Sequence, residues 1–215
     1  MRDLRNEFGA AVQNLAEVRV PPVVRNVGIV IAGSYLAAVC AHVVVPLWFT
    51  PVPLSLQPFA VLLLALVLSP RLAAVTLGAY LAEGAMGLPV FAPGAEGLAH
   101  LFGPTGGYLM AYPAAAALIS YLWRRARRGT GRATGSGFFA ALLAAAAGDL
   151  LILGCGALWL AVWMQVWSHG SAWSHGSAQA ALGMAVFPFL PGDALKVAAA
   201  AGLVAGWVRI RRQSI

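Results

Sequence analysis

The sequence predicts an all-α fold: an integral membrane bundle of six transmembrane helices, preceded by an N-terminal amphipathic helix. Composition is the first reason. Hydrophobic residues make up 60% of the 215 residues and charged residues only 10%, whereas soluble domains carry about 25% charged residues. Spacing is the second reason, because the apolar residues form six separate runs, most of them near the ~20 residues that cross a bilayer. An ordinary soluble enzyme does not fit these observations.

The N-terminal segment, residues 1–26, is polar and precedes the first apolar run. Leu4, Phe8, Ala11 and Leu15 recur every three or four residues, so they share one stripe of a helix with charged residues opposite. A secretory signal would need an apolar core here, which the segment lacks. We expect an amphipathic helix on the cytoplasmic surface of the membrane, in preference to a disordered tail.

The six predicted membrane helices form one domain over residues 27–208, and residues 209–215 form a basic cytoplasmic tail. These helices cover residues 27–48, 54–68, 72–88, 105–123, 137–163 and 180–208. The second helix is short, and the sixth is interrupted by Pro188 and Pro191. Short or broken helices leave backbone polar groups at membrane depth, which is tolerated where they line protein or a cavity. Both helices therefore indicate a binding site.

The positive charge is explained by topology. The chain has 14 basic and 7 acidic residues, a balance of +7 that could also suit a nucleic-acid partner. Thirteen of the basic residues lie in clusters that a six-helix topology places on one side, as the positive-inside rule requires. We therefore expect a multi-pass protein of the cell inner membrane with both termini cytoplasmic and no nucleic-acid partner. Lys196, the only lysine, is the exception.

Four ionisable residues lie within the predicted helices: Glu83, Asp149, Asp193 and Lys196. Counting 1.5 Å per residue from the inner helix ends places them about 18 to 24 Å up, in the outer half of the membrane. Such residues usually mark ligand paths or internal ion pairs. Glu83 and Asp149 could touch ligand, a neighbouring helix or a partner.

Asp193 and Lys196 are the strongest candidates because residues three apart share a helix face. Pro191 and Gly192 predict a helix start, which would leave free backbone N–H groups beside the Asp193 carboxylate. We expect a polar clamp for a ligand, although a self-neutralising ion pair is the alternative. Asp149 and Asp193 could also form the carboxylate pair of an intramembrane enzyme, which is the weaker function class.

Small residues form a separate pattern in the first membrane helix. Gly33, Ala37 and Ala41 are four residues apart and make one smooth ridge. Such ridges let two helices approach closely in lipid. The ridge could pack within the chain or dock onto another membrane subunit.

The remaining motifs predict no covalent chemistry. No Walker motif follows residues 103–107, which instead predict a helix start with Thr105 as N-cap. No nucleophile triad or metal motif is present, so we expect no catalytic residue, metal or cofactor. His42 and His100 are expected to be solvated near the outer interface, and Cys40 and Cys155 to be packing residues. The repeat at 167–178 is expected in a tolerant outer loop.

Four motifs in order resemble the BioY family, the biotin-specific substrate-binding (S) component of energy-coupling factor (ECF) transporters. They are TPVPLSLQ at 50–57, GLPVFA at 87–92, GPTGGY at 103–108, and PFLPGD at 188–193 followed by Lys196. The resemblance covers about residues 27–208. It departs from the family where Ser55 replaces the usual Thr, and at 92–94, where some relatives carry a polar residue.

The resemblance implies a six-helix protein that is not an enzyme and binds biotin near the outer face. It implies that Asp193 and Lys196 are polar biotin contacts. The other expected substrate-binding residues are Gln57, Phe91, Tyr108, Trp48 and Glu83, and Phe102 could also pack on the ligand. It further implies delivery of biotin inward through a transmembrane coupling protein and two ATPases, with Gly33, Ala37 and Ala41 as the docking stripe. An S component for another vitamin is the alternative.

Overall fold

A computed structural model describes residues 21–93, 97–129, 136–166 and 183–213 of the chain. The elements are α2 Pro22–His42, β1 Val44–Val45, β2 Leu54–Ser55, α3 Gln57–Val67, α4 Pro70–Ala85, α5 Leu98–Leu101, α6 Gly106–Gly129, α7 Ser136–Val166 and α9 Leu190–Gln213. The chain is mostly helical, as predicted. The predicted amphipathic helix and the repeat at 167–178 lie largely or wholly outside the described residues.

The predicted end of the first membrane helix and the predicted start of the second are wrong, because a small antiparallel hairpin replaces both. Strand β1 pairs with β2 in the register Val44 with Ser55 and Val45 with Leu54, so the fold is not purely α. Valine favours extended backbone, and the prolines that follow β1 and precede β2 cannot continue a helix. The second predicted helix therefore shortens to α3, which has 11 residues.

Helix α2 begins earlier than predicted. It starts at Pro22, where the fixed φ of proline suits the first turn of a helix. The predicted boundary after residue 26 therefore falls inside this helix.

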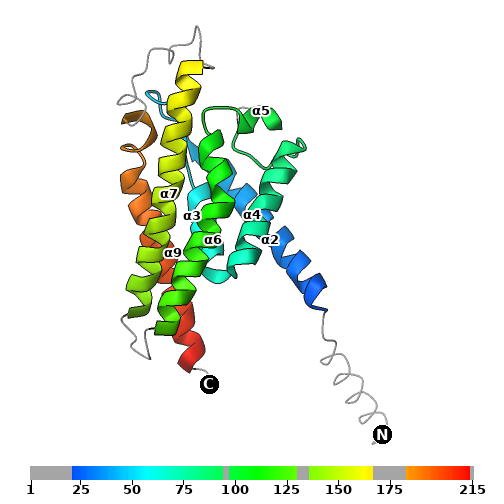
Figure 1. The fold of residues 1–215 in the computed structure, drawn as a ribbon, viewed down its shortest axis with the longest axis vertical. Helices are drawn as coiled ribbons and strands as arrows, with labels where there is room; N and C mark the ends of the chain where they lie inside the picture. The colour runs from blue at the N-terminus through cyan, green and yellow to red at the C-terminus, as the bar shows by residue number, and fades with distance from the viewer. Residues whose placement is uncertain (1–20, 94–96, 130–135, 167–182, 214–215) are drawn as a thin grey trace, which may run out of the picture.

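The short helix α3 occupies the centre of the bundle. It packs against α2, α6, α7 and α9, and most of its side chains are buried. Figure 1 shows α6, α7 and α9 side by side along the long axis, with α4 beside α6 and α2 next to α4. An 11-residue helix spans only about 16 Å. The space beyond its N-terminal end is closed by the hairpin and by the segment that leads into α9.

Glycines let α6 and α7 approach closely. A Cβ atom on Gly156 would collide with the ring of Tyr108, and one on Gly148 would collide with Ile119. A Cβ atom on Gly107 would collide with Trp159. These contacts fix the rotation of α6, and therefore the direction of the tyrosines that it carries.

The predicted docking stripe is buried inside the chain. Ala37 and Ala41 are fully buried, and a Cβ atom on Gly33 would meet Thr76 at 2.5 Å and Leu64 at 3.3 Å. The stripe therefore packs against α3 and α4, which corrects the expectation that it faces a partner subunit. Its small residues allow α2 to approach these two helices.

Three described segments are long and apolar enough to cross a membrane: Pro22–His42, Gly137–Val166 and Gly183–Arg211. The basic ends of several helices gather at one end of the bundle. In Figure 1 the start of α2, the start of α4 and the ends of α6 and α9 lie toward the lower end, and each carries arginines. The hairpin and α5 lie toward the opposite end.

Candidate functional site

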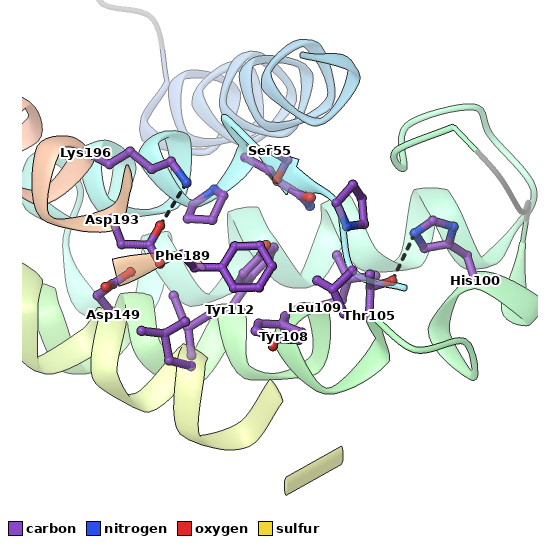
Figure 2. Close-up of a pocket in the computed structure, with 16 residues that line it drawn as sticks. Ser55, His100, Thr105, Tyr108, Leu109, Tyr112, Asp149, Phe189, Asp193 and Lys196 are labelled. Carbon is purple, nitrogen blue, oxygen red and sulfur yellow. Dashed lines mark hydrogen bonds and ion pairs between the residues drawn. The ribbon is translucent and has the colours of Figure 1, made fainter. Parts of the chain in front are cut away.

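A cavity lies inside the bundle at the end that holds the hairpin and α5. It is lined by residues of the hairpin, α3, α5, α6, α7 and α9 (Figure 2): Val52, Pro53, Ser55, Gln57, Pro58, His100, Thr105, Tyr108, Leu109, Tyr112, Asp149, Ile152, Leu153, Phe189, Asp193 and Lys196. Its volume is about 50 Å³, room for about three water molecules. Figure 2 shows the Phe189 ring between its two ends.

One end of the cavity is charged. Lys196 Nζ donates a hydrogen bond to Asp193 Oδ1 over 2.8 Å, and both side chains are buried. Asp149 comes from α7 and lies beside this pair in Figure 2. The sequence spacing therefore correctly placed Asp193 and Lys196 on one helix face.

Helix α9 begins earlier than its predicted start signal. Its first residue is Leu190, and the Asp193 N–H already donates to the carbonyl of Phe189 over 2.8 Å. The Asp193 backbone N–H is therefore not the free donor that was expected beside its carboxylate. The two side chains of the pair remain the polar groups that α9 offers to the cavity.

Gln57 forms a polar wall of the cavity from the start of α3. Its Nε2 donates to Tyr80 Oη over 2.8 Å, and Tyr80 donates to the Val90 carbonyl over 2.9 Å. A tyrosine hydroxyl has one proton, so the Gln57 atom that faces Tyr80 has to be its amide nitrogen. The amide oxygen is therefore directed away from Tyr80, and no donor among the described residues reaches it.

His100 and Thr105 form the opposite end of the cavity. The His100 ring is buried and stacks on Phe91 with 5.0 Å between ring centroids. Its Nε2 lies 3.4 Å from Thr105 Oγ1. The prediction of a solvated His100 was wrong, because the chain between α4 and α5 folds Phe91 beneath the imidazole. His42, by contrast, is exposed.

The segment before α9 is tied down on two sides of the cavity. Tyr108 Oη donates to the Ala185 carbonyl over 2.7 Å, and Thr50 Oγ1 donates to the Met184 carbonyl over 3.0 Å. Thr50 belongs to the hairpin connection and Tyr108 to α6. These two hydrogen bonds hold the turn that carries Phe189.

The structure brings only some of the predicted site residues to the cavity. Asp193, Lys196, Gln57 and Tyr108 line it. Phe91 is buried behind the wall, between Tyr80 and His100, rather than in the lining.

Trp48, Phe102 and Glu83 lie outside the cavity lining. Trp48 is 91% exposed in the hairpin connection and Phe102 is also exposed. Glu83 Oε1 accepts a hydrogen bond from Ser34 Oγ over 3.0 Å, which joins α4 to α2. Distance along the sequence could not show that the hairpin turns Trp48 away from the bundle.

Other lining residues escaped the sequence analysis. Tyr112 follows Tyr108 by four residues and so shares its helix face; that spacing could have identified it. Phe189 lies inside the PFLPGD motif, in which only Asp193 was predicted to bind the ligand. Asp149 was predicted at the same membrane depth as Asp193, and as its partner only for an intramembrane enzyme; it was not among the expected substrate-binding residues, yet it lines the cavity. Within the described ranges, no group of three His, Cys, Asp or Glu side chains could hold a metal ion.

The chain is similar to known biotin transporters. It is 52% identical over 65 residues to the probable biotin transporter BioY of Pyrococcus horikoshii, covering 30% of this chain and 40% of that protein. It is 40% identical to the biotin transporter BioY of Thermotoga maritima, covering 42% of this chain and 54% of the relative. The chain thus spans less than two thirds of either protein. It is 32% identical to the biotin transporter BioY of Rhodobacter capsulatus, covering 83% of this chain and 94% of the relative.

The fold is similar to a solved structure. The S-component for biotin from an ECF-type ABC transporter superposes with a TM-score of 0.72 and 25% sequence identity, covering 88% of this chain and 92% of that one. The model of the BioY family matches residues 11–213. The chain therefore belongs to the BioY family.

Proposed function

We propose that this chain is the biotin-binding component of a vitamin uptake transporter, which captures biotin at the outer face of the membrane. The observation that carries the proposal is the buried Asp193–Lys196 pair, which lines a cavity in a fold similar to a biotin S-component. A buried ion pair is not a strong source of stability. Its position at a cavity instead suits a ligand that needs both a donor and an acceptor.

The chemistry of biotin matches the charged end of the cavity through its ureido ring. That ring has two N–H donors on either side of a carbonyl oxygen. Lys196 donates to the carbonyl oxygen, and the Asp193 carboxylate accepts one N–H. The valerate carboxylate would meet the negative charges of Asp193 and Asp149 at this end, so it points toward His100 and Thr105.

Access to the cavity requires movement of its outer wall. A volume of about 50 Å³ is far below the ~300–1,000 Å³ of ordinary small-molecule pockets. The Phe189 ring and the hairpin turn aside as biotin enters and close over it afterwards. The hydrogen bonds of Thr50 and Tyr108 to the segment before α9 set how readily this happens.

The proposed setting is a cell inner membrane, crossed six times, with both termini cytoplasmic. The basic helix ends gathered at one end of the bundle support this orientation. The cavity then lies toward the outer face. The boundaries proposed are a cytoplasmic N-terminal segment, one six-helix membrane domain and a short basic tail.

The proposed partners are an ECF transmembrane coupling protein and two ATPase subunits. The similar solved chain is an S-component of an ECF-type ABC transporter, which supports an energising module of this kind. No Walker motif occurs in the 215-residue sequence. Energy for inward delivery is therefore supplied by the partner subunits.

Isothermal calorimetry on the purified full chain tests the proposal. We expect tight binding of biotin by the wild type and loss of at least tenfold in affinity for Asp193→Asn and for Lys196→Ala. Trp48→Ala is the control, because its side chain is exposed and outside the lining. Absence of biotin binding by the intact wild type would overturn the proposal. Preference for another vitamin would indicate a different S component, and turnover of a substrate would indicate an enzyme.

A further inference from the structure

Asp149 is a buried carboxylate in the cavity lining, and the proposed function gives it no contact with the ligand. Its side chain is 7% exposed and comes from the middle of α7, opposite the α9 turn that carries Asp193 and Lys196. In Figure 2 it lies at the charged end of the cavity, beside Asp193. All three side chains line the same cavity.

Asp149 has no hydrogen-bond or ion-pair partner in the part of the chain that the structure describes. Every described side-chain oxygen that is closed off from solvent has a hydrogen-bond partner. Because the Asp149 carboxylate has none, its oxygens are not closed off, and they are open to the cavity that the residue lines. Buried polar groups are nearly always hydrogen-bonded. A buried carboxylate that opens onto a cavity needs a hydrogen-bond donor there, and a ligand with N–H groups can supply it.

The charges at this end do not balance within the protein. Lys196 is the single lysine or arginine among the described residues that line the cavity, and its Nζ is already hydrogen-bonded to Asp193. Asp149 is therefore a second acceptor without a matching donor. A ligand group with two N–H donors around one carbonyl oxygen supplies what the three side chains lack, whereas a ligand carboxylate would be repelled.

A packing role does not account for this residue. Ile152 and Leu153, one turn further along α7, are apolar lining residues, and Ala145, one turn earlier, is fully buried. An apolar side chain at position 149 would continue this face without any buried charge. The carboxylate is therefore explained by what the cavity binds.

We propose that Asp149 is a second substrate-binding carboxylate, which accepts one ureido N–H of biotin while Asp193 accepts the other and Lys196 donates to the carbonyl oxygen. This inference rests on the proposed function. It makes Asp149 a specificity-determining residue, because it selects ligands with two N–H donors in one plane.

Two biotin analogues test the assignment, each methylated on a different ureido nitrogen. Binding of biotin and of both analogues is measured by calorimetry on the purified full chain, as wild type and as Asp149→Ala. A charge-assisted hydrogen bond corresponds to about a 10- to 100-fold change in affinity. We expect Asp149→Ala to weaken biotin binding by that factor. We also expect it to remove the discrimination against one methylated analogue while keeping the discrimination against the other.

The outcomes separate this inference from the proposed function. Unchanged biotin affinity in Asp149→Ala, or an equal loss for biotin and both analogues, would overturn the role of Asp149. Failure of the wild type to bind biotin would overturn the proposed function itself. If Asp149→Ala does not fold, Asp149→Asn is tested with the same ligands, and thermal unfolding in detergent identifies folded protein. Leu150→Ala, on the exposed side of α7, is the matched control.

Discussion

Tyr80 fixes the orientation of the Gln57 amide at the wall of the cavity. Gln57 Nε2 donates to Tyr80 Oη over 2.8 Å, while Tyr80 donates its own proton to the Val90 carbonyl over 2.9 Å. Tyr80 is fully buried and packs edge-on against Phe91. One tyrosine thus connects a residue of the cavity wall to the chain that runs from α4 to α5.

Tyr80→Phe is therefore expected to weaken biotin binding by about 5- to 50-fold. The change removes the one hydrogen-bond partner that the described residues give the Gln57 amide, and it leaves the partly buried Val90 carbonyl without its Tyr80 donor. Leaving a buried acceptor unsatisfied costs about 1–3 kcal/mol, and a partly buried one less. Calorimetry and thermal unfolding in detergent measure the two effects. Tyr121→Phe, on the exposed face of α6, is the control. Biotin affinity equal to that of the wild type would show that Gln57 does not depend on Tyr80.

Thr50→Val is expected to speed biotin dissociation by about 3- to 10-fold. Valine keeps the shape of threonine but cannot donate to the Met184 carbonyl, so the segment that carries Phe189 loses one of its two ties. Release of labelled biotin from purified protein measures the rate. Thr76→Val is the matched control, because its hydroxyl donates only to Leu72 of its own helix. Equal rates for Thr50→Val and wild type would contradict a role for this tie in closure.

The sequence was sufficient for much of the helical framework. Long apolar runs correctly located α6 and α7, and the three-residue spacing correctly placed Asp193 and Lys196 together. The spacing of apolar residues and their hydropathy are local properties of the chain, so they predict local structure well.

What the sequence missed depended on contacts between distant segments. His100 is buried where Phe91 stacks on it, and Trp48 is exposed in the hairpin connection. The small-residue stripe of α2 could face inward or outward, since a smooth ridge serves packing in either direction. The packing of α7 on α9 brings Asp149 to the same cavity as Asp193. Counting along the helices predicted a similar depth for the two residues, but not which helix faces meet.

Ala37→Leu is expected to lower the free energy of unfolding by about 1–3 kcal/mol, because Ala37 is fully buried between α2 and its neighbours. Thermal unfolding in detergent measures this. Ala32→Leu, on the exposed face of the same helix, is the control and should unfold like the wild type. Wild-type stability of Ala37→Leu, together with lost uptake in the complete transporter, would instead support a docking role for the stripe.

The Asp193–Lys196 pair allows stability and binding to be separated. Either single change, Asp193→Asn or Lys196→Met, leaves one buried charge without its partner, and breaking a buried pair in this way costs about 3–5 kcal/mol. The double variant removes both charges, so its unfolding temperature should recover toward that of the wild type. Biotin binding should not recover, because the donor and the charged acceptor are both gone. Calorimetry on the double variant, once shown to be folded, decides the matter: restored biotin affinity would mean that the pair serves only the fold.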